Sequence, residues 1–362
     1  MKILQLHTKM VSGGIEAVVC NLSNELSNTH DVTLCTIFQP TEQDVFYQKL
    51  SDKVKKNTIG KKQVGFSIKE IWKIFRVVQK GKYDVVHVHG CFQYYFLTIA
   101  CLHPKVRFVY TVHSDANKEN QTWDWRLFKL KRYMFVHRWM LPVTISEASQ
   151  QSFAALYHCE STLIHNGIAK GKVNASSKSV MDKLRKAEKT KVFLHAGRIS
   201  TPKNQQVLCS VFQTLIATHH DVALVIAGTA EESDIYEKLK PYFCDRIVYI
   251  GERNDVADLM AFADAFCLPS LWEGLPMTLL EALSVGCIPI CTPVGGIVNV
   301  IESGKNGLLS ADASETAYLS AVKTYLSMTD EECERMKANA IGSFGKYDIK
   351  NCVKQYLKVY SL

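Results

Sequence analysis

The sequence contains no apolar run that approaches the ~20 residues of a membrane-spanning helix. Its first residues, Met-Lys-Ile-Leu-Gln-Leu-His, have polar side chains where a signal peptide has an apolar core. The 12 cysteines include no Cys-x-x-Cys pair, and no Asp-x-Asp triplet occurs in the 362 residues. These absences favour a cytoplasmic protein with buried, reduced thiols, and they leave no sequence signature for a metal site.

Positive charge is present in excess, but only in one half of the chain. Residues 1–169 contain 21 Lys and Arg against 13 Asp and Glu, whereas residues 170–362 contain 22 of each class. The whole net charge of +8 therefore belongs to the first half. A basic domain favours anionic partners such as phospholipid head groups, a lipid pyrophosphate or nucleic acid; the alternative is a basic surface that serves only solubility.

Short apolar segments alternate with helical patterns along the chain. Lys2–His7 is typical of a buried strand, and Ile15–Leu26 has the spacing of a helix with one apolar face. The polar stretch Ala169–Thr190 interrupts the alternation, and we interpret it as a linker. Buried parallel strands that alternate with helices predict an α/β protein with doubly wound parallel sheets. The length suits two Rossmann-like domains, predicted at residues 1–169 and 170–346.

The most informative segment is Ser270–Gly286, in which Glu273 and Glu281 bracket a Gly-Leu-Pro turn and the start of an apolar helix. Pro276 suits the first turn of a helix, and Gly274 allows a ligand to approach the backbone closely. Free N–H groups at such a helix start favour an anion, typically phosphate. Acids on either side of a phosphate could bind the hydroxyls of a sugar nucleotide; the alternative is a pair of ordinary surface acids.

Two motifs in the second half resemble a known family. The pattern Trp272-Glu-Gly-Leu-Pro-(x4)-Glu281-Ala resembles the Glu-x7-Glu signature of retaining GT-B glycosyltransferases of family 4. Upstream, His195-Ala-Gly-Arg198-Ile-Ser-Thr-Pro-Lys203 is similar to the Gly-Arg-Leu-x-x-x-Lys segment of the same family.

Three further elements follow the order of that family, so the resemblance covers nearly the whole chain. They are Ser12-Gly-Gly14-Ile-Glu16, Ile164-His-Asn-Gly-Ile168 and the segment from Val294-Gly-Gly-Ile to Asn306-Gly-Leu-Leu309. Two positions depart from the pattern. Asn204 stands where a glycine usually follows the lysine, and Asn299 stands where a glutamate usually follows the paired glycines. These departures concern local loop shape rather than residues expected to act in catalysis.

The resemblance implies a GT-B fold, in which two Rossmann-like domains face each other across a cleft. The final helix, about residues 347–362, would pack back on the first domain. The resemblance also implies that Arg198 and Lys203 bind the donor diphosphate, with the Arg as a planar fork and the Lys as a compact charge. Glu273 would bind hydroxyls of the transferred sugar and Glu281 those of the ribose, since a carboxylate suits a vicinal diol. The backbone contacts to donor sugar and phosphate would come from Gly274, Leu275, Pro276 and Met277.

Further candidates lie in the first half. His113 follows an expected strand, where α/β folds bind ligands, and the family often has a His near the sugar and the donor phosphate. The alternative is a hydrogen-bonded structural His. Gly14 lies between the first strand and the first helix and could face a phosphate or the acceptor, although tight turns use Gly-Gly widely. His87 and His89 share one strand face, but without a third ligand we expect no metal there.

The stretch Trp123–Met140 mixes aromatic side chains with cations. The cations are Arg126, Lys129, Lys131, Arg132 and Arg138. This composition suggests an interfacial membrane helix, but the cations spread over more than one face, so a core helix with a basic outer side is the alternative. No nucleic-acid-binding module accompanies these residues, and we expect no nucleic-acid partner.

Together these observations predict a retaining, metal-independent glycosyltransferase with no cofactor beyond its nucleoside-diphosphate sugar, with UDP favoured and GDP open. The second domain would bind the donor and the first a glycan or lipid-linked acceptor, in surface polysaccharide biosynthesis. The basic first domain would allow peripheral association with the inner face of the plasma membrane. Alternatives are an epimerase of the same fold and a non-catalytic nucleotide-sugar-binding module. A phosphorylase would need a Lys-bound pyridoxal phosphate, for which no site is apparent.

Overall fold

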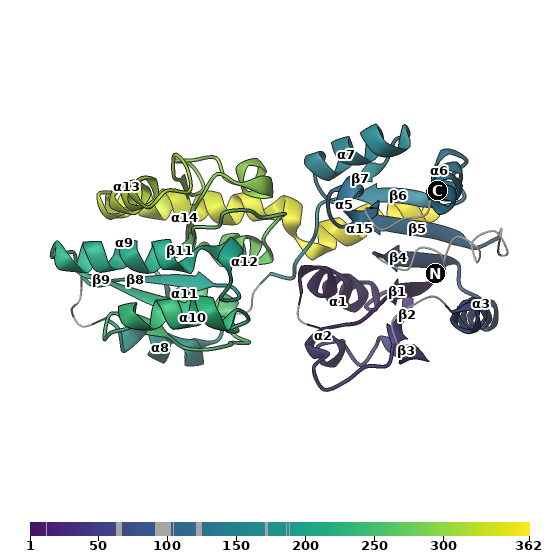
Figure 1. Ribbon diagram of the computed structural model, residues 1–362, viewed down its shortest axis with the longest axis horizontal. Helices are drawn as coiled ribbons and strands as arrows, with labels where there is room; N and C mark the ends of the chain where they lie inside the picture. The colour runs from purple at the N-terminus through teal and green to yellow at the C-terminus, as the bar shows by residue number, and fades with distance from the viewer. Residues whose placement is uncertain are drawn as a thin grey trace. The chain divides into compact units, whose positions relative to one another are not determined.

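The computed structural model describes residues 1–11, 13–62, 67–90, 103, 105–120, 125–170, 173–185, 187 and 189–362. Ser12 of the expected glycine turn and Trp123 of the aromatic stretch lie outside these residues. The chain forms two compact units: Met1–Ala169 together with Lys346–Leu362, and Lys170–Gly345. Each unit is built around one parallel sheet (Figure 1).

The first unit has a seven-stranded sheet in the order β3-β2-β1-β4-β5-β6-β7. The strands are β1 (Lys2–His7), β2 (Asp31–Phe38), β3 (Lys55–Lys61), β4 (Val85–His89), β5 (Arg107–Val112), β6 (Leu141–Thr144) and β7 (Thr162–Leu163). The helices are α1 (Gly14–Leu26), α2 (Val45–Gln48), α3 (Ile68–Gly81), α5 (Ala116–Asn120), α6 (Trp125–Val136), α7 (Glu147–Tyr157) and α15 (Ile349–Ser361). Because the order reverses between β1 and β4, the carboxyl ends of these two strands mark the switch point where such sheets bind ligands.

The two faces of this sheet differ in polarity. One face is apolar, with Leu4 and Leu6 of β1 in a core that also includes side chains of α3, α6 and α7. On the opposite face Ile3 is followed by Gln5 and then His7, and the neighbouring β4 continues this polarity because Gln5 pairs in register with His87. The helices α1 and α15 cover this second face.

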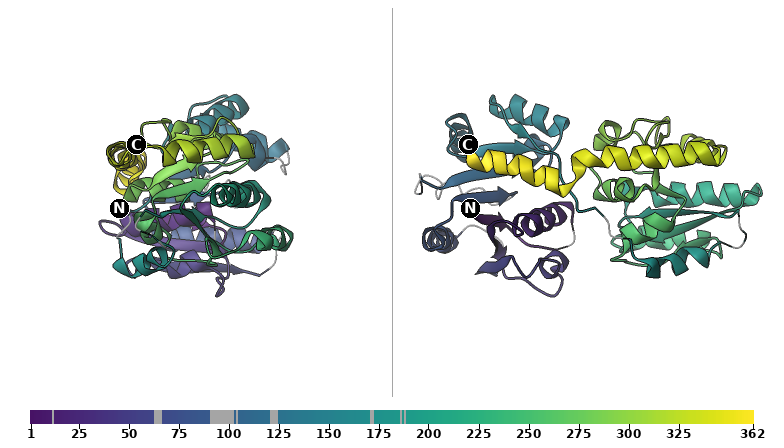
Figure 2. Two further views of the ribbon diagram at one scale, coloured as in Figure 1. Left: turned by 90° about the vertical axis from the view of Figure 1, so that its left-hand side faces the viewer. Right: turned by 180° about the vertical axis from the view of Figure 1, so that it is seen from behind.

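The final helix α15 belongs to the first unit. Its buried positions recur at helical spacing and are Ile349, Cys352, Val353, Tyr356, Val359 and Tyr360. Gly167 allows the close approach, since a Cβ atom there would lie 2.6 Å from Cβ of Cys352. Figure 2 shows this helix, in yellow, lying along the sheet of the first unit. The segment Ile164–Ile168 therefore has a packing role.

The second unit has a six-stranded parallel sheet in the order β10-β9-β8-β11-β12-β13. The strands are β8 (Lys191–Ala196), β9 (Val222–Ala227), β10 (Ile247–Tyr249), β11 (Ala265–Leu268), β12 (Ile288–Cys291) and β13 (Leu308–Leu309). The helices are α8 (Lys178–Asp182), α9 (Gln205–Ala217), α10 (Ser233–Leu239), α11 (Val256–Phe262), α12 (Met277–Val285), α13 (Glu315–Leu326) and α14 (Asp330–Phe344). The predicted α/β class with two doubly wound parallel sheets is confirmed.

Sequence patterning missed two strands and misplaced one helix start. The strand β3 is mostly polar, because it forms the sheet edge and buries few side chains, and β13 is only two residues long. Pro276 precedes α12 as its N-cap residue, so the helix begins one position later than expected, at Met277. Within the described residues, no helix is both long and apolar enough to cross a membrane.

Candidate active site

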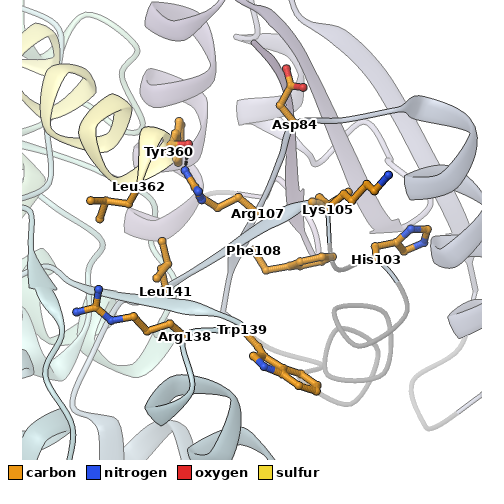
Figure 3. Close-up of a pocket in the computed structure, with 11 residues that line it drawn as sticks. Asp84, His103, Lys105, Arg107, Phe108, Arg138, Trp139, Leu141, Tyr360 and Leu362 are labelled. Carbon is orange, nitrogen blue, oxygen red and sulfur yellow. Dashed lines mark hydrogen bonds between the residues drawn. The ribbon is translucent and has the colours of Figure 1, made fainter.

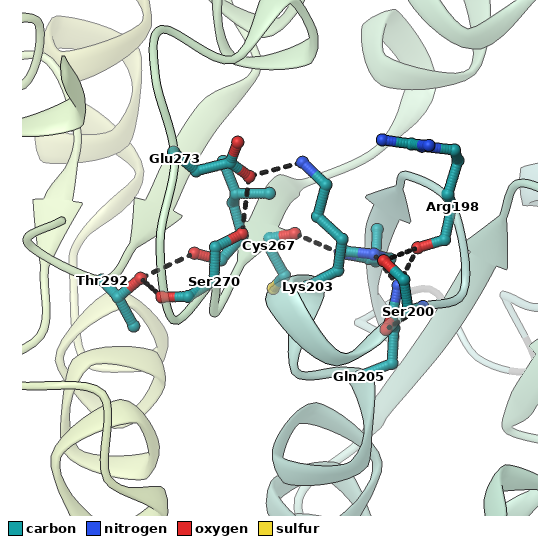
Figure 4. A network of polar contacts seen from close by, with 10 residues as sticks. Arg198, Ser200, Lys203, Gln205, Cys267, Ser270, Glu273 and Thr292 are labelled. Atoms are coloured by element: carbon teal, nitrogen blue, oxygen red, sulfur yellow. Dashed lines mark hydrogen bonds and ion pairs between the residues drawn. The ribbon is translucent and has the colours of Figure 1, made fainter. Parts of the chain in front are cut away.

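Lys203 and Glu273 form the centre of the candidate site in the second unit. Lys203 ends the short 3-10 helix η2 (Thr201–Lys203), and Glu273 lies in the loop between β11 and α12. The Lys203 ammonium donates to Oε1 of Glu273, and the two side chains are only 17% and 11% exposed. Ser270 donates its hydroxyl to the same oxygen at 2.8 Å. Figure 4 shows the three side chains converging. Since both contacts use Oε1, Oε2 of Glu273 has no hydrogen bond from the described residues and can accept one from a ligand.

The loop with Glu273 is fixed by residues that follow other strands of the sheet. Thr292, after β12, donates its hydroxyl to the carbonyl of Ser270 at 2.5 Å. Asn204 donates its amide to the carbonyl of Pro269 at 3.2 Å. Asn204 has a φ of 53°, a left-handed conformation that glycine and asparagine adopt more readily than other residues. The asparagine at this position, where the family usually has a glycine, is therefore compatible with the conformation of the loop.

Glycines set the close spacing of the loops around the site. Gly295 has a φ of +55°, and a Cβ atom there would lie 1.8 Å from the carbonyl oxygen of Glu273. Gly296 donates its N–H to the carbonyl of Gly274 at 2.7 Å. A Cβ atom on Gly228 would lie 2.0 Å from the carbonyl oxygen of Gly197, just before Arg198. The Gly-Gly motif thus positions Glu273, and Gly228 positions the loop of Arg198.

A buried imidazole, His195, helps to hold the loop that contains Arg198. His195, the fifth residue of β8, donates Nδ1–H to the carbonyl of Cys267 at 2.9 Å, and its Nε2 accepts from Nε2 of Gln205 at 3.1 Å. Gln205 also donates to the carbonyl of Arg198 at 2.7 Å. Burial lowers the pKa of His195 to about 4, which keeps the ring neutral and suited to this pattern. His195 therefore has a structural role.

Arg198 lies at the solvent-exposed side of the site. Its guanidinium pairs with Glu231 at 2.8 Å, and the two side chains are 56% and 49% exposed. Exposed pairs of this kind contribute about 0–1 kcal/mol, so Arg198 can exchange Glu231 for a ligand phosphate with little loss. Glu231 could not be identified from the sequence, because it is one of three polar residues in the loop between β9 and α10.

The remaining donor-site candidates surround the start of α12. Gly274 is exposed, Leu275 is half-buried and Pro276 is buried. Pro276 is the N-cap residue of α12 and has no side-chain group that could cap the first N–H groups of the helix. Glu281 is half-buried in the second turn of α12. The structure thus brings Arg198, Lys203, Glu273 and this helix start to the carboxyl edge of one sheet. By contrast, Asn306 is structural, since its side chain donates to the carbonyl of Val300 at 3.0 Å.

His113 and Gly14 belong to the first unit. Gly14 is exposed and begins α1, with open space where a Cβ atom would be. His113 follows β5 and is buried, and burial lowers its pKa to about 3. Its Nε2 lies 3.1 Å from Nδ1 of His89. Both ring nitrogens of His89 make hydrogen bonds, since its Nε2 also lies 2.6 Å from Oε1 of Gln5. Among the described residues, no group of three or more His, Cys, Asp or Glu side chains is placed to hold a metal ion.

A basic pocket of about 550 Å³ lies elsewhere in the first unit, at the amino ends of its strands (Figure 3). Lys105, Arg107 and Arg138 line it together with Asp84 and Trp139. Arg107 donates to the carbonyl of Tyr360 at 2.7 Å, so it also holds the end of α15.

The expectation that Lys131 belongs to a basic surface is wrong. Its side chain is 1% exposed, and its ammonium lies 4.4 Å from the ring centre of Tyr110 and 5.3 Å from that of Tyr157. Burial lowers its pKa to about 7, although Glu119 opposes the shift. The aliphatic residues of α6 alternate with cations, and sequence periodicity alone did not show that this cation faces the core.

Comparisons with known proteins support the reading of both units. Residues 176–342 match the family described as glycosyl transferases group 1, and residues 12–170 match glycosyltransferase family 4. The chain is 27% identical to an uncharacterized glycosyltransferase of Haemophilus influenzae over 82% of each chain. It is 27% identical to the UDP-Gal:alpha-D-GlcNAc-diphosphoundecaprenol alpha-1,3-galactosyltransferase of Escherichia coli, over 67% of this chain and 66% of that one.

The fold has known counterparts. A structure of the Anabaena protein HepE in complex with UDP and glucose superposes with a TM-score of 0.78 at 19% identity, over 100% of this chain and 99% of that one. The likeness concerns the fold alone, and it agrees with the two parallel-sheet units. From the two family matches, which together span most of the sequence, the chain belongs to the glycosyl transferases of group 1 and has the GT-B fold.

Proposed function

We propose that the chain is a retaining glycosyltransferase that moves a sugar from a nucleoside-diphosphate sugar, with UDP favoured, to a glycan or lipid-linked acceptor in surface polysaccharide assembly. The Lys203–Glu273 pair beside the uncapped start of α12 carries this proposal. A cation and a helix start suit a diphosphate, and a carboxylate with one open oxygen suits a sugar hydroxyl. The Escherichia coli relative, named for a UDP-galactose donor and a lipid-linked acceptor, supports the choice of substrates.

In the proposed reaction the protein stabilises the leaving group. Lys203 and Arg198 offset the negative charge that develops on the released diphosphate, Glu273 holds the sugar, and Glu281 holds the ribose. The bond between C1 of the sugar and the phosphate oxygen breaks, and the acceptor oxygen bonds to C1 on the same face. The acceptor proton passes to the released phosphate oxygen. His113 contacts the sugar from the first unit.

Nucleotide binding tests the donor site directly. Replacing Arg198 with Ala is expected to weaken binding of UDP or GDP by about 10- to 100-fold, because hydrogen bonds from a charged group contribute about 1.5–3 kcal/mol. Isothermal titration calorimetry measures the change. The control is Arg246→Ala, which removes an arginine paired with Asp221 at 3.3 Å in the same unit. An unchanged affinity in Arg198→Ala would remove this residue from the site.

The reaction is proposed to need no metal ion. The cations Lys203 and Arg198 supply the charge that Mg²⁺ supplies in other transferases. Sugar transfer should therefore proceed at the same rate after EDTA treatment and dialysis. A complete loss of activity in EDTA that Mn²⁺ restores would show that the two side chains do not suffice.

The first unit is proposed to bind anionic lipid through the surface of α6 and the turn after it. Tyr133, Val136 and Trp139 are each 48–49% exposed there, beside the exposed Lys129 and Arg138. Aromatic and basic side chains in combination are typical of helices that bind at a membrane interface.

A vesicle co-sedimentation assay tests this attachment. Binding to vesicles that contain phosphatidylserine should fall with salt, because the contacts are screened. Replacing Lys129, Arg138 and Lys105, which lines the same pocket as Arg138, with Glu should weaken it, since each nearby cation contributes about 1 kcal/mol. The matched control places Glu at three exposed lysines of the second unit, Lys238, Lys305 and Lys323. If the unmodified protein ignores such vesicles at low salt, a soluble acceptor becomes the better proposal.

A further inference from the structure

The sheet face covered by α15 carries a continuous chain of buried polar side chains, of which only His113 takes part in the proposed reaction. Its members are Gln5 on β1, His87 and His89 on β4, Thr111 and His113 at the end of β5, and Tyr360 on α15. Gln5, His87, His89 and Thr111 are all 0% exposed. Buried polar groups are unfavourable unless they are hydrogen-bonded, and on the other face of the same sheet the buried side chains of β1, Leu4 and Leu6, are apolar. The hydrogen bonds among these side chains therefore offset the cost of burying them.

The chain begins at the hydroxyl of Tyr360. It accepts from Nε2 of Gln5 at 3.4 Å and lies 2.7 Å from Nδ1 of His87, to which it donates. His87 then donates Nε2–H to Oγ1 of Thr111 at 2.7 Å. These contacts orient the Gln5 amide with its oxygen directed away from α15.

The amide oxygen of Gln5 determines which ring nitrogen carries the proton in His89 and, through His89, in His113. Oε1 of Gln5 lies 2.6 Å from Nε2 of His89, which must therefore donate. Because burial keeps His89 neutral, its Nδ1 has a lone pair and accepts Nε2–H of His113 at 3.1 Å. His113 then has a lone pair on Nδ1. Nδ1 is buried and has no hydrogen-bond partner among the described residues.

Further contacts fix the backbone around the two rings. His7 contacts the carbonyl of His89 through Nδ1 at 2.7 Å, and Glu119 accepts the backbone N–H of His113 at 2.9 Å. With both strand ends held, the contact with His89 orients the ring of His113, and its Nδ1 is the ring nitrogen without a hydrogen-bond partner among the described residues.

We propose that Gln5, oriented by Tyr360 of the final helix, is a positioning residue that acts through His89 to keep His113 protonated on Nε2, so that its Nδ1 lone pair accepts a hydroxyl group of the substrate. This inference rests on the proposed function, in which His113 contacts the sugar. It makes His113 a hydrogen-bond acceptor for a hydroxyl rather than a cation for the phosphate. It also gives α15 a part in the reaction, because the helix supplies the hydroxyl that orients Gln5.

Nitrogen-15 NMR of imidazole side chains tests the tautomer without an activity assay. The protein is labelled at histidine nitrogens, and His113 is assigned from the spectrum of His113→Asn. In the unmodified protein His113 should show a protonated Nε2 and an unprotonated Nδ1. In Gln5→Met, which has similar length but no acceptor oxygen, a mixture of tautomers is expected. Protonation of Nδ1 in the unmodified protein, or an unchanged tautomer in Gln5→Met, would overturn the proposal.

Kinetics and nucleotide binding provide the second readout. Gln5→Met should lower kcat by about 10- to 100-fold, because hydrogen bonds to the reacting sugar are sensitive to small misplacements. The affinity for UDP, which binds in the other unit, should not change. Tyr360→Phe removes one hydroxyl with little risk to folding and should lower kcat in the same direction. An unchanged kcat in both variants would count against a positioning role.

Tyr325→Phe is the matched control, since it removes a hydroxyl that donates to the carbonyl of Asp264 at 2.8 Å in the second unit. It should alter neither the His113 tautomer nor kcat, and a loss of kcat as large as in Tyr360→Phe would show a general effect of stability. If the unmodified protein binds no nucleotide and transfers no sugar, the proposed function fails, and the NMR result alone decides the positioning of His113.

Discussion

Replacing Lys203 with alanine is expected to lower kcat by about 100- to 1000-fold, the usual loss when one preorganised donor to a developing anion is removed. The ammonium of Lys203 is held by Glu273 in a largely buried pair, so its position before the reaction is already fixed. Turnover of UDP-sugars and GDP-sugars in a steady-state assay measures the effect. Lys305→Ala, which removes an exposed lysine paired with Glu302, should retain the original rate.

Loss of Lys203 also leaves Glu273 without its cation, and this could reduce activity through stability alone. Breaking one side of a buried pair costs up to about 3–5 kcal/mol, whereas replacing both partners is often close to neutral. The double variant Lys203→Met with Glu273→Gln should therefore regain most of the thermal stability while remaining inactive. A double variant with near-original kcat would show that the pair serves the fold and not the reaction.

Gly295→Ala is expected to have the second-largest effect. The new Cβ atom would lie 1.8 Å from the carbonyl oxygen of Glu273, so the loop with this acid must move. A shift of about 1 Å in a reacting group can lower the rate by about 100-fold. The left-handed backbone adds a loss of stability of about 1–2 kcal/mol. Steady-state kinetics and thermal unfolding measure the two effects.

Gly304→Ala is the control variant, because it introduces a similar backbone strain without displacing the loop that contains Glu273. Gly304 has a φ of +82°, but nothing lies within 4 Å of a Cβ atom built there. This control should lose stability to a similar degree and keep its kcat. If Gly295→Ala retains the original kcat, the loop of Glu273 is more tolerant than its packing indicates.

The sequence by itself determined the fold class, because apolar strands and amphipathic helices recur with clear periods along the chain. It also placed Arg198, Lys203 and Glu273 in loops after strands, and parallel strands bring such loops to one edge of the sheet. What the pattern could not show was their pairing. Lys203 and Glu273 are 70 residues apart, and only the tertiary structure brings them together.

The tertiary structure also decided which polar residues face the interior. Lys131 and Lys129 look alike in the sequence, yet the first lies among aromatic rings and the second is exposed. His89 lies in an ordinary strand pattern, and its role depends on Gln5, 84 residues earlier, and on the covering helix. Local periodicity reports which face of an element is apolar, whereas hydrogen bonds between distant elements depend on how the sheet is assembled. The sequence therefore suffices to propose which residues have chemical roles. Their protonation states and hydrogen-bond partners depend on the tertiary packing.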